Sequence, residues 1–169
     1  GYLLNDASAA LENFKRLVQE FPETPQALAS LDRYKNFYSF PGDEISRARV
    51  YLQHGRFKNV LEILKDKTDR ESLALRAEAF CGLKDYTQAV AILEGLTKEK
   101  DKGELRLRLG EVYLTGLAEE KGIQLLEKLI EENEGSRFGC LALWDLLNYW
   151  KKREDMEKAK IYSRRLREN

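Results

Sequence analysis

Residues 104–129 read ELRLRLGEVYLTGLAEEKGIQLLEKL, and this stretch decides the fold. Gly110 is followed by an aromatic residue, Tyr113, three positions later and by a second glycine, Gly122, after twelve. On both sides of residues 116–117, apolar residues recur at the three- and four-residue spacing of an amphipathic helix. The stretch therefore predicts two helices joined by a tight turn at residues 116–117.

The same pattern occurs four times along the chain. In each copy a small or aliphatic anchor is followed by an aromatic residue after three positions and by a second anchor after twelve. The four sets are Ala48, Tyr51 and Val60; Ala77, Phe80 and Ala89; Gly110, Tyr113 and Gly122; and Leu147, Trp150 and Ala159. A repeated helical hairpin cannot bury its apolar face alone, so the pattern predicts hairpins that stack on their neighbours.

The distances between copies vary in a way that a helix tolerates. The first anchors are 29, 33 and 37 residues apart, and the second anchors show the same three gaps. Four residues make about one helical turn, so such a change lengthens a helix and keeps the same face toward the core.

The first forty residues also have helical periodicity. We expect Asp6 to cap the first helix, and Thr24 to cap the second with Pro25 at its first position. The second helix is expected to run through Tyr38, and Asp43 to cap a third. Further tight turns are expected at residues 55–56, 83–85 and 153–155, with longer connections near 66–69, 98–102 and 133–136. This gives ten helices in five antiparallel pairs.

At this point the chain resembles the tetratricopeptide repeat family, whose signature places Leu-Gly, Tyr, Ala and Phe at similar spacing. The best-matching repeat has Leu109, Gly110, Tyr113, Gly122, Leu126 and Leu129, and the preceding one has Ala77, Phe80, Ala89, Leu93 and Leu96. The Trp of the signature is replaced by Glu44, Leu73, Arg106 and Leu143. The resemblance implies an all-α, right-handed superhelix of antiparallel helix pairs.

The expected organisation follows from these repeats. Residues 1–40 form an N-terminal helix pair, a partial or capping repeat, and residues 41–169 form four repeats. The repeats cover about residues 41–69, 70–102, 103–139 and 140–169.

The N-terminal segment carries a second resemblance. Residues 10–27 are similar to a run common in tetratricopeptide proteins of the bacterial cell envelope, with Phe14, Phe21-Pro22 and Ala27 at matching positions and Thr24 in place of the usual Ser. This likeness favours the bacterial periplasm or cell envelope over the cytoplasm. The chain lacks a starting Met, so we interpret it as an excised or processed fragment.

Composition excludes several classes of function. The chain has 29 basic and 29 acidic residues, so no net positive field favours nucleic acid as a partner. No uninterrupted apolar run of about 18 residues exists, so direct membrane insertion is not expected. Residues 101–134 are net acidic and residues 137–169 net basic, which is consistent with orientation of a partner or with self-association.

No catalytic site, cofactor or metal site is expected. The single histidine, His54, precedes a turn glycine and has no nucleophile or carboxylate placed to form a catalytic triad. Cys81 and Cys140 have no metal-ligand spacing and are interpreted as small buried thiols. We therefore expect a protein that is not an enzyme.

The resemblance implies that the first helix of each pair lines a concave face where ligands bind. Positions −3, +1 and +4 from the first anchor share one side of that helix. The residues expected on this face are Ile45, Arg49, Leu52, Ala74, Glu78, Leu107, Glu111, Leu114, Trp144, Asn148 and Lys151. Trp144 is either an exposed anchor for a ligand or a side chain packed under the terminal helix.

The expected function is a protein-interaction scaffold that binds a peptide or partner helix in this groove, in the assembly or organisation of a bacterial envelope complex. Two alternatives stay open. The chain could be a helical accessory domain of a larger envelope enzyme, or it could assemble with itself into an oligomeric scaffold.

Overall fold

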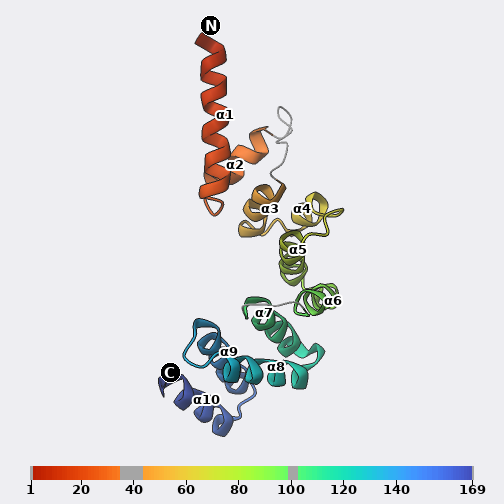
Figure 1. Ribbon diagram of the computed structural model, residues 1–169, viewed down its shortest axis with the longest axis vertical. Coiled ribbons are helices and arrows are strands. Elements are labelled where there is room, and N and C mark those ends of the chain that lie inside the picture. Colours follow the sequence, from red (N-terminus) through yellow and green to blue (C-terminus); the bar gives the residue numbers. More distant parts are fainter. Residues whose placement is uncertain (1, 35–43, 99–102, 169) are drawn as a thin grey trace. The chain divides into compact units, whose positions relative to one another are not determined.

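The structure is a computed structural model that describes residues 2–34, 44–98 and 103–168 (Figure 1). These residues form helices and turns, with no strand among them, so the expected all-α fold is confirmed. Within these described ranges, ten α-helices and one π-helical turn follow one another. They are α1 (Tyr2–Glu20), α2 (Pro25–Tyr34), α3 (Glu44–Gln53), α4 (Phe57–Ile63), α5 (Arg70–Gly82), α6 (Tyr86–Leu96), α7 (Glu104–Val112), η1 (Tyr113–Leu117), α8 (Glu119–Glu132), α9 (Arg137–Lys152) and α10 (Met156–Glu168).

The starts of the helices can be compared with the capping residues expected from the sequence. The Thr24 hydroxyl accepts a hydrogen bond from the Ala27 amide at 3.3 Å, so Thr24 caps α2 as expected. The expectation that Asp6 caps the first helix is wrong, because the residues before it already lie in α1. Tyr38 and Asp43 lie outside the described residues.

The tight turns fall where the sequence places them. Residues 55–56, 83–85 and 153–155 separate consecutive helices, and Gly55 adopts a positive φ of 69° that favours glycine. The turn at residues 116–117 differs in detail, because α7 ends in the π-helical turn η1, where Gly116 has a φ of 111°.

The chain divides into two compact units, Gly1–Lys84 and Asp85–Asn169. The division falls in the tight turn after α5. Unit 1 therefore holds α1 to α5, and unit 2 holds α6 to α10.

The core of unit 1 joins all five of its helices. Its buried residues are Val18, Ala27, Leu31, Ala48, Val50, Tyr51, Val60, Leu64 and Ala79. Ala48 and Val60, the two anchors of the first repeat, are fully buried in it. The α3–α4 hairpin is thus packed through the small residues that the pattern singles out.

The core of unit 2 is built from α7 to α10. Its buried residues are Leu107, Leu126, Leu129, Ile130, Ala142, Leu143, Leu146, Leu147, Ala159 and Tyr162. Gly110 shows why one anchor is so small: a Cβ atom there would lie 2.5 Å from Cδ2 of Leu126. Helices α7 and α8 therefore approach too closely for a side chain at this anchor.

Candidate functional site

The eleven residues expected on a concave face are divided between the two units. Unit 1 places five of them on α3 and α5, which contact each other. Unit 2 places six on α7, η1 and α9, where α7 contacts α9. Each unit therefore has its own candidate face, which we call the α3–α5 face in unit 1 and the α7–α9 face in unit 2.

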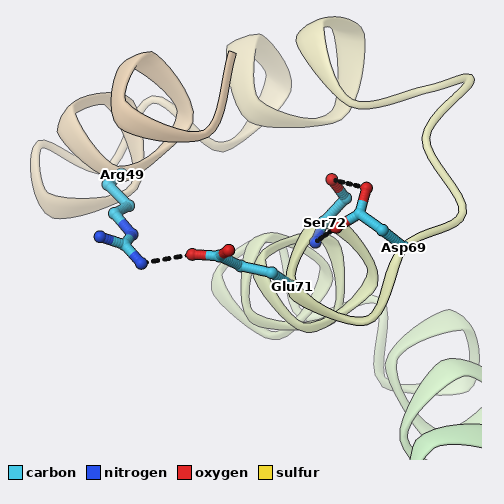
Figure 2. Close-up of polar contacts among 4 residues, drawn as sticks. All are labelled: Arg49, Asp69, Glu71 and Ser72. Atoms are coloured by element: carbon cyan, nitrogen blue, oxygen red, sulfur yellow. Dashed lines mark hydrogen bonds and ion pairs between the residues drawn. The ribbon is translucent and has the colours of Figure 1, made fainter. Parts of the chain in front are cut away.

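On the α3–α5 face, Arg49 is exposed and its guanidinium forms an ion pair with the carboxylate of Glu71 (Figure 2). Glu71 lies in the first turn of α5, so the pair connects the two helices of this face. Both side chains are about half exposed, which allows water or a ligand to compete for either charge.

The position of Glu71 is set by the cap of α5. Asp69 accepts a hydrogen bond from the Ser72 amide at 2.9 Å, and the Ser72 hydroxyl donates another to Asp69 at 2.7 Å (Figure 2). These bonds from Ser72 hold the pKa of Asp69 below its ordinary value. The cap fixes the start of α5 and thereby directs Glu71 toward Arg49.

The apolar part of the α3–α5 face is mostly turned inward. Ile45 and Leu52 are half-buried and pack against the core of unit 1. Ala74 is also half-buried, whereas Glu78 is exposed. This face therefore offers charged and small groups to a partner more than apolar area.

On the α7–α9 face, Trp144 keeps 51% of its surface exposed. Of the two alternatives for Trp144, an exposed side chain is the one the structure shows. Leu141, one turn earlier on α9, is 36% exposed. Leu107 is only 8% exposed and belongs to the core, so it is a packing residue that a ligand cannot reach.

The remaining expected residues of this face lie on α7, η1 and α9. Leu114 is half-buried against the core, Asn148 is half-buried on α9, and Lys151 is exposed at the last turn of α9. The Glu111 carboxylate accepts a hydrogen bond from Arg108 at 2.7 Å.

Asp145 is a titratable residue of this face that sequence reasoning missed. Burial raises its pKa from 3.8 to about 7, the negative charge of Glu111 adds to the increase, and Arg108 opposes it. Its Oδ2 atom is buried and has no hydrogen-bond partner among the residues that the structure describes. The spacing rule covers positions −3, +1 and +4 from the anchor, whereas Asp145 and Leu141 lie outside these positions on α9.

Other polar groups of unit 2 serve packing. Glu119 of α8 accepts a hydrogen bond from the Tyr149 hydroxyl at 2.9 Å and forms an ion pair with Arg153. The Nζ atom of Lys158 lies 3.8 Å from the centre of the Trp150 ring. These contacts tie α9 to α8 and to α10.

The histidine and the two cysteines that the sequence offers for chemistry all lie within the described residues. Nε2 of His54 lies 3.1 Å from the carbonyl oxygen of Thr24, a contact that joins α3 to the start of α2. Cys81 and Cys140 are half-buried, so the expectation that both are buried thiols is wrong. Within residues 2–34, 44–98 and 103–168, no group of three or more His, Cys, Asp or Glu side chains could hold a metal ion.

None of the described helices is both long enough and apolar enough to cross a membrane. Compared with known proteins, the chain matches no family model and no curated protein.

Proposed function

We propose that this protein is a tetratricopeptide-like interaction scaffold that binds a peptide or partner helix on the α7–α9 face of unit 2. The observation that carries the proposal is the exposure of Trp144 beside Leu141. A large rigid indole exposed next to another apolar side chain is typical of an interaction surface.

The two faces support this reading in different ways. The α7–α9 face supplies apolar area at Trp144 and Leu141, and its polar groups stand beside that area. The α3–α5 face supplies exposed charge at Arg49 and Glu71. The α7–α9 face by itself offers apolar area with polar groups on the same helices, and this suits an extended peptide or an amphipathic helix, in which apolar and polar side chains alternate around the backbone.

We extend the proposal to the assembly of bacterial envelope complexes. This extension is supported by the likeness of residues 10–27 to tetratricopeptide proteins of the bacterial envelope. Ala27, one of the matching positions of this run, is buried in the core of unit 1.

The experiment is a selection of binders from a random peptide library on the full 169-residue chain. Affinities of the selected peptides are then measured by fluorescence anisotropy for the chain and its variants. Trp144→Ala is expected to weaken binding by about 30-fold, the loss typical of an interface hot spot.

The matched control is Ile161→Ala. Ile161 is also an exposed apolar residue of unit 2, at 57%, but lies on α10. The control is expected to leave affinity within about twofold. Equal affinities of the Trp144→Ala variant and the unaltered chain, with helical circular dichroism unchanged, would remove Trp144 from the site and contradict the proposal.

A further inference from the structure

The α7–α9 face combines an exposed apolar patch with charged groups. Leu141, Trp144, Asp145 and Asn148 follow one another at steps of three and four residues, so they share one side of α9. Glu111 of α7, the helix packed on α9, acts electrostatically on Asp145. Asp145 therefore follows the exposed indole on the same side of α9 and lies within electrostatic range of Glu111.

The charges on this surface do not balance. Within the described part of the chain, Arg108 is the one cation that acts on Asp145, and its guanidinium already donates a hydrogen bond to the Glu111 carboxylate at 2.7 Å. Two carboxylates thus share one positive charge. Carboxylates brought together in this way favour the approach of a second cation.

The carboxyl group of Asp145 also lacks a hydrogen-bond donor. Its Oδ2 atom is buried, and no donor in the described part of the chain reaches it. A buried polar atom without a partner carries a cost that a donor from a ligand can remove once the side chain turns outward.

Two other aromatic rings of α9 have a cation close to them, and the ring of Trp144 can be compared with these. Lys158 lies over the Trp150 ring, and Arg153 has its Cζ atom 5.3 Å from the centre of the Tyr149 ring. Trp144, also on α9, has no such cation over it among the residues that the structure describes. An indole face is the aromatic surface that cations prefer.

We propose that the α7–α9 face binds an arginine-containing peptide, with the arginine side chain stacked on Trp144 and its guanidinium paired with the carboxylates of Asp145 and Glu111. Arginine fits better than lysine because its planar guanidinium can stack and donate two parallel hydrogen bonds at once. Leu141 contacts an apolar residue that flanks the arginine. This inference rests on the proposed function and specifies its partner.

The test begins with the peptides selected on the full chain, counter-selected against the Trp144→Ala variant. We expect them to be enriched in arginine next to an aliphatic or aromatic residue. A synthetic peptide is then compared with its citrulline version, which keeps the shape of arginine and loses the charge. The citrulline peptide is expected to bind about tenfold more weakly.

Variants of the chain assign this preference to the two carboxylates. In the double variant Glu111→Gln, Asp145→Asn, the arginine and citrulline peptides are expected to bind within about threefold of each other. The matched control is Glu131→Gln, which removes an exposed carboxylate of α8 in the same unit. It is expected to keep the full preference for arginine.

The preference for arginine is also expected to grow between about pH 6 and pH 8. Glu111 and Arg108 of α7 are the charged groups that act on Asp145. Of the other helices packed on α9, Glu119 of α8 is engaged by Tyr149 and Arg153, and Lys158 of α10 lies over Trp150. Deprotonation of Asp145 in this range therefore adds the second negative charge.

The outcomes separate this inference from the proposed function. Peptides that depend on Trp144 but lack basic residues, or that bind equally as citrulline versions, would overturn the inference and leave the scaffold role standing. If no selected peptide depends on Trp144, both fail. A preference for arginine that survives the double variant would also overturn the inference, because it would place the guanidinium elsewhere.

Discussion

The Tyr113 hydroxyl donates a hydrogen bond to the carboxylate of Glu94, nineteen residues earlier, and so joins η1 to α6. The first repeat has a related arrangement at the same sequence distance. Tyr51 occupies the position of Tyr113, and Asp32 precedes it by nineteen residues. Burial, and next the charge of Asp32, raise the pKa of Tyr51. An aromatic hydroxyl near an acid of the preceding hairpin therefore occurs in both units.

Replacement of Tyr113 by Phe tests what this hydroxyl contributes. Burial and the hydrogen bond to Glu94 raise the pKa of Tyr113 from 10.0 to about 12. Because the folded chain favours the neutral hydroxyl, its contribution is complete below about pH 10 and is lost as the pH rises through about 12. We expect Tyr113→Phe to lower the free energy of unfolding by about 1 kcal/mol at neutral pH.

The same variant should be less sensitive to alkali. Urea unfolding followed by circular dichroism is measured near pH 8 and near pH 11. The difference in stability between the unaltered chain and Tyr113→Phe is expected to shrink at the higher pH. A constant difference at both values would contradict a role for the neutral hydroxyl.

Gly110 and Gly95 make a matched pair that tests close helix packing. Alanine normally stabilises a helix relative to glycine by about 1 kcal/mol. At Gly110, however, a Cβ atom would lie 2.5 Å from Cδ2 and 2.6 Å from Cγ of Leu126, which is fully buried. We expect Gly110→Ala to destabilise unit 2 by about 1–2 kcal/mol, because overpacking outweighs the gain in propensity.

At Gly95, near the end of α6, a Cβ atom would meet nothing within 4 Å. Gly95→Ala is therefore expected to stabilise the protein by about 0.5 kcal/mol. Urea unfolding of the two variants provides the comparison. Stabilisation by both substitutions would show that α7 and α8 can move apart at little cost.

Much of the helical fold is predictable from local signals. The anchors recur at fixed spacing because they must be small or apolar where helices meet, and all eight are buried. Thr24 and Pro25 mark the start of α2 through cap chemistry that involves only neighbouring residues. The prediction that Asp6 caps the first helix is wrong because aspartate also occurs inside helices. Only the residues before Asp6 decide whether it caps a helix or lies within one.

The candidate site is less predictable because it depends on contacts between helices. The spacing rule places Trp144 on a face of α9, but whether α10 covers it depends on how the two helices pack. Likewise, Arg49 is expected as a polar group of the face, whereas its pairing with Glu71 across 22 residues depends on how α3 meets α5. Leu107 follows the same spacing rule and is nevertheless buried in the core.

The ion pair of Arg49 and Glu71 can be tested by charge reversal. Both side chains are about half exposed, at 52% and 51%, so the pair contributes at most about 1 kcal/mol. Arg49→Glu alone places two carboxylates together and is expected to lower the free energy of unfolding by about 0.5–1 kcal/mol. The double variant Arg49→Glu, Glu71→Arg is expected to restore most of this loss.

The swap also provides the correct variant for binding studies on the α3–α5 face. Arg49→Glu confounds a lost ligand contact with repulsion from Glu71, whereas the double variant keeps the ion pair and reverses its direction. Chemical denaturation of the four proteins completes a double-mutant cycle. Simple additivity of the two single substitutions would mean that the side chains do not interact in solution.

Asp145 predicts that stability falls as the pH rises. Burial, and next the charge of Glu111, raise its pKa from 3.8 to about 7, so the folded chain favours the protonated carboxyl. Between about pH 4 and pH 7 the unfolded chain ionises at this position while the folded chain does not. The stability contributed by the neutral form is therefore lost across this range.

Asparagine keeps the shape of the neutral carboxyl and cannot ionise. We expect Asp145→Asn to be more stable than the unaltered chain near pH 8, by on the order of 2 kcal/mol, and nearly equal to it near pH 4.5. Urea unfolding at these two pH values measures both differences, with Glu131→Gln as the control for removal of an acid from unit 2. If Asp145→Asn were instead destabilising near pH 8, the ionised carboxylate would have to be held by Arg108 more strongly than it is repelled by Glu111.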